Sequence, residues 1–150
     1  MDFFRKRILP VLIVIAVLFI WIHSCMPADM STAESGFIMD LIKPFLELFT
    51  GEGNVTPHLV RKLAHFTEFA GLGFLVGLHS GFGLIWPFCG LAVAFVDETI
   101  QLFVEGRAGM VQDMWIDISG YMLGWIVSSV LVILITKAIK GKREESKNGS

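Results

Sequence analysis

Four long stretches of mostly apolar side chains, separated by segments rich in polar residues or glycine, dominate the chain. They cover residues 8–26, 63–78, 82–104 and 114–136. Each is close to the roughly 20 residues that a helix needs to cross a bilayer, and the second is the shortest. The turns between the last three stretches are short, so consecutive helices run antiparallel. The pattern therefore predicts an all-α membrane protein with four antiparallel transmembrane helices.

The longest connection, residues 27–56, carries a helical pattern of its own after a polar start. Apolar side chains recur on one face and polar side chains on another: Phe37, Ile38, Leu41, Ile42, Phe45, Leu46 and Phe49 against Asp40, Lys43 and Glu47. This spacing predicts an amphipathic helix on the outer membrane surface, between the first two spans, that is kinked or interrupted at Pro44. The helix is either a lid over the bundle or an interfacial connector.

Composition and charge place the chain in a membrane and orient it. With 54% hydrophobic residues and a mean hydropathy of +0.68, the 150-residue chain is too apolar for a small soluble domain. Eight of the twelve lysines and arginines flank the ends of the predicted bundle: Arg5, Lys6, Arg7, Lys137, Lys140, Lys142, Arg143 and Lys147. The positive-inside rule then puts both termini in the cytoplasm. We expect residues 1–136 to form one transmembrane domain and residues 137–150 a basic, disordered cytoplasmic tail.

The first apolar stretch has a second interpretation. A basic start followed by an apolar run is also typical of a secretory signal peptide, and Cys25 suggests a lipoprotein site. His23 fits poorly just before such a cysteine, and three further apolar stretches follow, so an uncleaved helix is favoured. Cys25 lies at the outer end of the first span and Cys89 in the inner half of the third, so we expect no disulfide between them.

Local signals predict where the second span begins and how the helices pack. Thr56-Pro57 combines a hydroxyl N-cap with proline at the first helical position. Small residues repeat at four-residue spacing on the second and fourth spans: Gly73, Gly77 and Gly81, and Gly120, Gly124 and Ser128. Because glycine lacks a Cβ atom, such repeats let helix backbones approach closely.

Polar side chains interrupt the last three apolar stretches, where a charge is costly unless it is paired or hydrated. The second span carries Arg61, Lys62, His65 and Glu68, the third carries Asp97, Glu98 and Gln101, and the fourth carries Asp113 and Asp117, with Arg107 in the turn between. Helical spacing puts most of each set on one helix face. At 1.5 Å per residue, Glu68, Asp97 and Asp117 each lie roughly 5–10 Å inside the outer boundary. The pattern therefore predicts one polar cluster in the outer half of the bundle.

The charges in this region do not balance. Three cations, Arg61, Lys62 and Arg107, face six carboxylates: Glu68, Asp97, Glu98, Glu105, Asp113 and Asp117. Either some carboxyl groups are protonated or a bound cation joins them. Structural roles also fit single residues: Asp113 as a helix N-cap, Glu105 and Arg107 as a solvated loop, and His65 with Glu68 as a hydrogen-bonded pair. Taken together, ionisable groups on three helices favour a functional site.

Several chemistries suit such a cluster. One histidine among carboxylates (His65 with Glu68, Asp97, Glu98 and Asp117) suits a hard or borderline divalent metal ion, although the sequence has no HExxH motif and no cysteine pair. Paired carboxylates also suit general acid–base catalysis. The sequence does not identify a nucleophile or assign catalytic residues. Polar residues do not continue into the inner halves of the spans, which argues against a transmembrane ion path.

The polar motifs resemble those of the VanZ-like family. The stretches that carry the resemblance are Arg61-Lys62-Leu63-Ala64-His65-Phe66-Thr67-Glu68, Asp97-Glu98-Thr99-Ile100-Gln101-Leu102-Phe103, Gly106-Arg107, and Asp113 with Gly120. The segment His23-Ser24-Cys25-Met26-Pro27, followed by Ser35-Gly36, is similar to the family's segment after the first span. The family pattern has Asn where this chain has Asp117, which adds a negative charge and removes one expected amide.

The resemblance implies a multi-pass protein of the bacterial cytoplasmic membrane, associated with low-level resistance to the glycopeptide teicoplanin. Two functions follow as expectations. In the first, an outward-facing polar site binds a lipid-linked cell-wall precursor or a lipoglycopeptide antibiotic. In the second, the protein is a membrane-embedded enzyme, with or without a divalent metal, that acts on a lipid or lipid-linked envelope substrate. Membrane lipids are expected partners in both, and nucleic acid in neither.

Overall fold

The computed structural model describes residues 3–51, 53–83, 85–107 and 111–148, and every regular element in these ranges is helical. A π-helical segment, η1 (Phe4–Ile8), leads directly into α1 (Leu9–Ser24). The remaining helices are α2 (Ala28–Thr50), α3 (Pro57–Ser80), α4 (Trp86–Gln101) and α5 (Val111–Asn148). The all-α prediction is therefore confirmed for the described residues.

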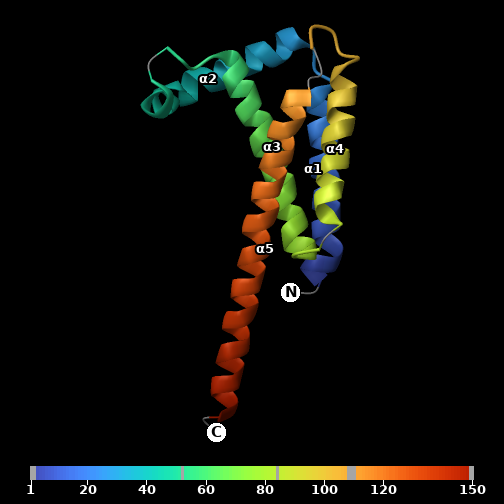
Figure 1. The fold of residues 1–150 in the computed structure, drawn as a ribbon, viewed down its shortest axis with the longest axis vertical. Coiled ribbons are helices and arrows are strands. Elements are labelled where there is room, and N and C mark those ends of the chain that lie inside the picture. Colours follow the sequence, from blue (N-terminus) through green and yellow to red (C-terminus); the bar gives the residue numbers. More distant parts are fainter. Residues whose placement is uncertain (1–2, 52, 84, 108–110, 149–150) are drawn as a thin grey trace.

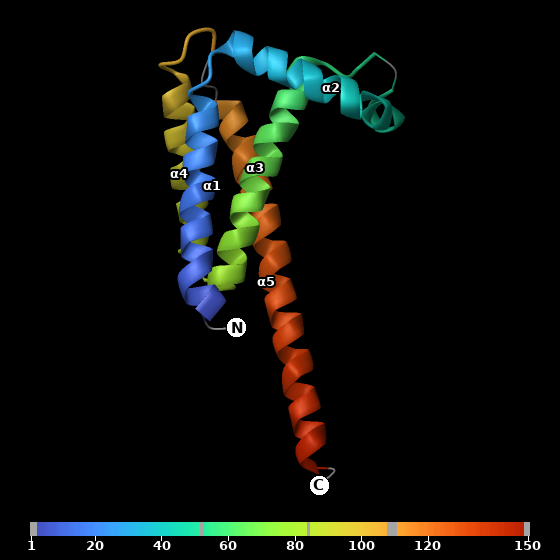
Figure 2. The same ribbon diagram turned by 180° about the vertical axis from the view of Figure 1, so that it is seen from behind.

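Four helices, α1, α3, α4 and α5, lie side by side and alternate in direction (Figures 1 and 2). Helix α2, the helix predicted in the connection between the first two spans, lies across one end of this bundle. The two termini lie toward the opposite end, and α5 projects well beyond the other helices there. The end next to α2, where α4 leads into α5, holds the polar residues singled out above.

Helix boundaries follow the local signals. The hydroxyl of Thr56 accepts a hydrogen bond from the backbone N–H of Leu59 at 3.2 Å, and Pro57 is the first residue of α3, which confirms the predicted start. Gly81 ends α3 with a φ of +62°, a conformation that a side chain would strain. Its role is thus to end the helix, and the prediction that it packs against a neighbouring helix was wrong because its Cβ position faces open space.

The closest helix contact joins α3 to α5 and depends on the other predicted glycines. A Cβ atom on Gly73 would meet the backbone carbonyl of Tyr121, and one on Gly77 would meet the Ser128 hydroxyl. From the other side, a Cβ atom on Gly124 would meet the carbonyl of Ala70. The two small-residue repeats therefore face each other, and their close approach fixes the register of α3 against α5.

The buried core lies below the polar end of the bundle. It combines residues from all four bundle helices: Ile20, Phe69, Leu72, Val76, Ala94, Tyr121 and Trp125. The phenol of Tyr121 donates a hydrogen bond to the backbone carbonyl of Trp86 at 2.8 Å, and the ring packs over Gly90, where a Cβ atom would collide with it. This contact positions α4 against α5.

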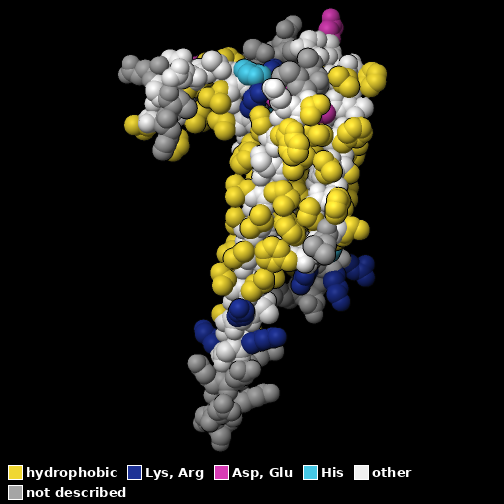
Figure 3. Space-filling model, viewed as in Figure 1, with side chains coloured by type: hydrophobic (Ala, Val, Ile, Leu, Met, Phe, Trp, Pro, Cys, Tyr) yellow, Lys and Arg dark blue, Asp and Glu magenta, His cyan; other side chains and the backbone are white. Residues whose placement is uncertain are grey.

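The outside of the bundle is apolar. Figure 3 shows hydrophobic side chains covering its middle, with lysines and arginines gathered at the end near the termini and a mixed polar group at the other end. Large apolar side chains such as Phe88 (68% exposed) point away from the protein. Two helical segments, Phe4–Ser24 and Val111–Lys142, are long and apolar enough to cross a membrane. In contrast, α4 has 16 residues and α3 carries His65 and Glu68 within its length.

Three boundaries differ from the prediction. Helix α2 begins at Ala28, earlier than the predicted start near residue 37, and it continues through Pro44, which is exposed and does not interrupt it. Helix α4 ends at Gln101, although apolar residues continue to Val104. Helix α5 is helical to Asn148, so the tail expected to be disordered extends it. That tail contains lysine, arginine and glutamate, which are good helix formers once a long helix precedes them.

Candidate functional site

A polar pocket of about 190 Å³ opens at the α2 end of the bundle. Its lining comes from α3 (His58, Arg61, Lys62, His65), α4 (Glu98, Gln101), the following loop (Gly106, Arg107) and α5 (Asp113, Ile116, Asp117). Eight of the ten residues predicted for the cluster line this pocket. The other two, Glu68 and Asp97, lie beside it, as described below.

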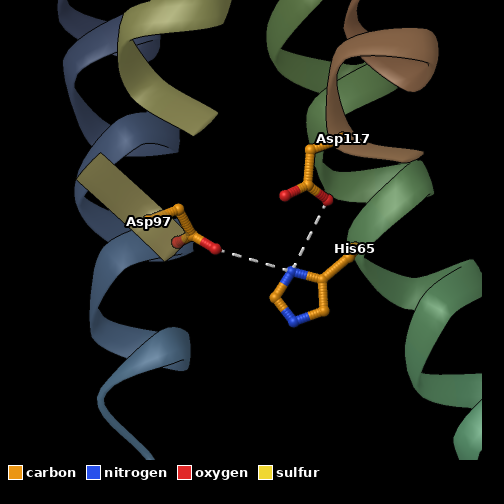
Figure 4. A group of neighbouring side chains, drawn as sticks. All are labelled: His65, Asp97 and Asp117. Atoms are coloured by element: carbon orange, nitrogen blue, oxygen red, sulfur yellow. Dashed lines mark ion pairs between the residues drawn. The ribbon is translucent and has the colours of Figure 1, made fainter. Parts of the chain in front are cut away.

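Two residues of the lining, His65 and Asp117, meet Asp97, which lies just behind the lining; these three residues, from three different helices, form what we call the base of the pocket (Figure 4). The Nδ1 atom of His65 lies 3.9 Å from Oδ2 of Asp97 and 4.0 Å from Oδ1 of Asp117. The three side chains are buried, with Asp97 at 0% and Asp117 at 1% exposure. The amide of Gln101 donates a hydrogen bond to Oδ2 of Asp97 at 2.9 Å, which orients that carboxylate. This arrangement matches the expected cluster.

Glu68 turns toward α1 rather than toward the pocket. Its Oε1 atom lies 2.7 Å from Nδ1 of His23, so Glu68 pairs with His23 and not, as in the purely structural alternative, with His65. The ring of His23 in turn stacks on that of His65, with centroids 6.0 Å apart and planes 11° apart. Arg107 donates from Nη2 to the backbone carbonyl of His23 at 3.5 Å. Glu68 therefore joins the cluster through His23.

Sequence reasoning did not assign a role in the site to His23 or to its neighbour Ser24. His23 bridges Glu68 and His65. Ser24 is fully buried, and its hydroxyl lies beside Asp97. The available signal was the similarity of residues 23–27 to the segment that follows the first span in VanZ-like proteins.

Charged residues at the mouth of the pocket pair locally. Lys62 forms an ion pair with Asp113 at 2.9 Å. Asp113 lies inside the first turn of α5, after Val111, so it does not act as the N-cap. Arg61 contacts the ring of His58 at 3.2 Å. Burial lowers the pKa of Arg107, and Arg61 lowers it further, whereas Asp97 and Glu68 raise it.

An apolar groove of about 920 Å³ lies on the other side of α3, between α1, α2 and α3. Its lining includes Ile15 and Phe19 from α1, Ile42 from α2 and Leu63 from α3. Glu68 reaches its edge, so one residue both lines the groove and bonds to His23. Side-chain contacts from Glu68 through His23 to His65 thus lead from the groove to the polar pocket, although the two share no lining residue. No sequence pattern predicted it, because it depends on how three separate helices are placed around it.

These features define a class: a small, all-helical membrane protein with a polar pocket in one end of its bundle and an apolar groove alongside. The chain belongs to the VanZ/LLP1 family, whose match covers residues 9–134 and so includes the whole cluster. The resemblance to VanZ-like proteins is therefore confirmed. No curated protein and no solved structure matches the chain. Asp117, at the position where the family pattern has Asn, is one of the three residues at the base of the pocket.

Proposed function

We propose that the chain spans the bacterial cytoplasmic membrane four times, with both termini in the cytoplasm and the polar pocket on the outer side. The clustering of lysines and arginines at the end of the bundle near the termini supports this orientation (Figure 3). Helix α4 is short, but the two residues after it, Leu102 and Phe103, are 63% and 86% exposed and extend its apolar surface. An even number of crossings agrees with termini at one end of the bundle.

On this topology, the outward pocket binds the polar head of a lipid-linked cell-wall precursor or of a lipidated glycopeptide. The single observation that carries this proposal is the junction between pocket and groove. Glu68 lines the apolar groove and bonds to His23, whose ring stacks on His65 in the polar pocket. A ligand with a polar head and an acyl chain can occupy both compartments at once.

The charges suit a ligand with an anionic head. Arg61, Lys62 and Arg107 line the pocket at and near its mouth, where phosphate or carboxylate oxygens can accept hydrogen bonds from them. The groove, at about 920 Å³, has the size of a site for an acyl chain and is lined almost wholly by apolar side chains. Membrane lipids themselves are the natural competitors for this groove.

Such a site explains a contribution to low-level resistance against teicoplanin-type antibiotics. Teicoplanin carries an acyl tail, whereas vancomycin does not. A site that is open to the outer leaflet can engage the tailed drug, or change lipid-linked material near it, without affecting the untailed one. We expect expression in a susceptible Gram-positive host to raise tolerance to acylated glycopeptides more than tolerance to vancomycin.

The test compares minimal inhibitory concentrations for both drugs in cells that express the wild-type protein, Glu68→Gln, Asp97→Asn or a control. Both substitutions keep shape and remove a charge, so each should abolish the gain in tolerance while the protein still reaches the membrane. Asp40→Asn is the matched control, because Asp40 is exposed on α2 and lies outside both compartments. Full tolerance in cells that express either site variant would show that the charges of Glu68 and Asp97 have only a structural role, which contradicts the proposal. Equal protection against both drugs would instead contradict a site that selects the acyl tail.

A second candidate is a membrane-embedded enzyme that acts on a lipid or lipid-linked envelope substrate. The observation that favours it is the convergence of His65, Asp97 and Asp117 at the base of the pocket, since buried histidine and carboxylate groups are the usual participants in acid–base and metal-assisted catalysis. Turnover of lipid-linked precursors by membranes containing the protein, lost in Asp97→Asn, would support this function. Drug tolerance without such turnover would support binding alone.

A further inference from the structure

We propose that His65, Asp97 and Asp117 bind one divalent transition-metal ion, of the Zn²⁺ or Mn²⁺ type, at the base of the polar pocket. This site deepens the enzyme candidate above and rests on it for its role, but the ion itself is tested without any substrate. The three residues come from α3, α4 and α5, so the site exists only in the assembled bundle.

The geometry comes close to that of a metal site. One donor atom from each residue lies within 4.8 Å of the other two, and the His65 nitrogen is 3.9 and 4.0 Å from the carboxylate oxygens. Donors bound about 2.1 Å from one ion lie about 3.0–3.4 Å apart. Side-chain rotations that move each donor atom by less than about 1 Å therefore bring all three donor atoms within bonding distance of one ion. Figure 4 shows Nδ1 of His65 directed between the two carboxylates.

Donor atoms at this position lack other partners. Among the described residues, Nδ1 of His65 and Oδ2 of Asp117 are fully buried and have no hydrogen-bond partner. Buried polar atoms in native proteins are nearly always paired, so unpaired ones require an explanation. The His65 side chain is 10% exposed and the Asp117 side chain 2% exposed, which makes bulk water a poor substitute. A metal ion would give Nδ1 of His65 a partner, and the Asp117 carboxylate, whose Oδ1 is the oxygen nearer to His65, can present either of its oxygens to the ion.

Charge balance points the same way. When both are ionised, the two buried carboxylates of Asp97 and Asp117 carry two negative charges, which a divalent ion neutralises. The nearby basic side chains contact other groups: Lys62 pairs with Asp113, Arg61 contacts His58, and Arg107 donates to the carbonyl of His23. Within the described parts of the chain, neither aspartate has an ion pair with lysine or arginine. Leaving two such charges close together without a cation is strongly unfavourable.

The chemical types of the donor atoms restrict which metal ions fit this site. One imidazole and two carboxylates suit borderline ions such as Zn²⁺ and Mn²⁺, whereas Mg²⁺ prefers oxygen ligands and retains its water. Three protein ligands leave coordination positions open toward the pocket that Arg61, Lys62 and Arg107 also line. An anionic oxygen of a ligand head can therefore reach the ion and these cations together. The proposed site needs Asp117, because the asparagine that the family pattern has at this position would supply an amide in place of a carboxylate.

The experiment measures ion binding by the full chain in detergent micelles. Protein freed of metal with a chelator is dialysed against Zn²⁺ or Mn²⁺, and bound metal and the thermal unfolding midpoint are recorded. We expect about one ion per chain and a midpoint that rises with ion concentration. Asp117→Asn and Asp97→Asn should weaken binding by more than the roughly 10–100-fold that loss of an outer partner costs. Asp40→Asn, at an exposed position of α2 outside both compartments, is the control, and it should bind as the wild type does.

The unfolding midpoints of the metal-free proteins distinguish a variant that misfolds from one that has only lost a metal ligand. Without metal, Asp117→Asn removes one of two neighbouring negative charges, so its unfolding midpoint should equal or exceed that of the wild type. The visible spectrum of bound Co²⁺ gives a second measurement, which should report nitrogen and oxygen ligands in the wild type and change in His65→Gln. Absence of stoichiometric Zn²⁺ or Mn²⁺ binding, or equal loss in Asp40→Asn and Asp117→Asn, overturns the proposal. Drug tolerance with no bound metal would leave the binding function in place while removing this site.

Discussion

The contact between Gly120 and Phe66 sets the distance between the helices that carry Asp117 and His65. A Cβ atom on Gly120 would meet the backbone carbonyl oxygen of Phe66 and would lie 3.1 Å from its carbonyl carbon. Backbone cannot rotate away as a side chain can, so Gly120→Ala must push α5 away from α3. Since carbon and oxygen normally lie about 3.3 Å or more apart, the required shift is about 1 Å.

Two opposing terms give the expected loss of stability. Overpacking of a tight contact costs typically about 1–3 kcal/mol, and a rigid backbone neighbour puts this case at the upper end. Replacing glycine by alanine inside a helix stabilises the folded state by about 0.5–1 kcal/mol, which offsets part of this loss. We therefore expect a net loss of about 2 kcal/mol, or a fall in the unfolding midpoint of roughly 4–8 °C. The same shift widens the His65–Asp117 separation from 4.0 Å and should abolish metal binding.

The assay is thermal unfolding in detergent at one fixed scan rate, with metal content measured on the same samples. Gly71→Ala is the control, because Gly71 lies on α3 only two residues from the seam and its Cβ position has nothing within 4 Å. This variant should gain about 0.5–1 kcal/mol and keep its metal. An unchanged unfolding midpoint in Gly120→Ala would refute the close approach of α3 and α5. Metal binding that persists in this variant would refute the claim that the spacing of these helices determines whether the site can bind an ion.

Two further predictions concern orientation and charge. The first uses a variant in which serine replaces Cys25 and Cys89, and adds a single cysteine at Asn54 or at Lys142. On intact cells, an impermeant thiol reagent should label Asn54→Cys and should not label Lys142→Cys. Labelling of Lys142→Cys would contradict cytoplasmic termini. Arg107→Ala should lower the free energy of unfolding by about 1–2 kcal/mol, because it removes the donor to the His23 carbonyl and a charge near Asp97. Arg107→Lys should recover part of the loss in the same thermal assay, whereas an equal loss in Glu105→Ala, at an exposed position in the same loop, would refute a specific role for Arg107.

The parts of the molecule that were predictable are those that depend on local periodicity. Apolar runs predicted the bundle helices, and the four-residue repeats of small residues predicted close helix contacts, which the structure places between α3 and α5. Polar residues inside apolar runs predicted the pocket, because burying an ionisable group is too costly to be accidental. Thr56 and Pro57 predicted the start of α3 because an N-cap acts within one turn.

The features that were missed depend on contacts between distant segments. His23 lies at the end of a helix with few other polar residues, and only the assembled bundle shows that it meets Glu68, 45 residues away. Glu68 shares a helix face with Arg61, but seven residues separate them, which is about 10 Å along the axis. At that depth the neighbouring element is α1, so the same face meets a different partner. The groove likewise exists only because three separate helices are placed around it.

The residues that position the site are mostly not polar. Gly120 and Gly124 let α5 approach α3, which brings Asp117 toward His65. Gly90 accommodates the ring of Tyr121, whose hydroxyl bonds to the carbonyl of Trp86, and this contact holds α4 and therefore Asp97 in register with α5. Each of the three groups at the base of the pocket thus depends on a close backbone contact elsewhere in the bundle. Because a shift of about 1 Å separates donors that can share an ion from donors that cannot, substitutions at these glycines should impair the site while leaving all of its charged residues in place.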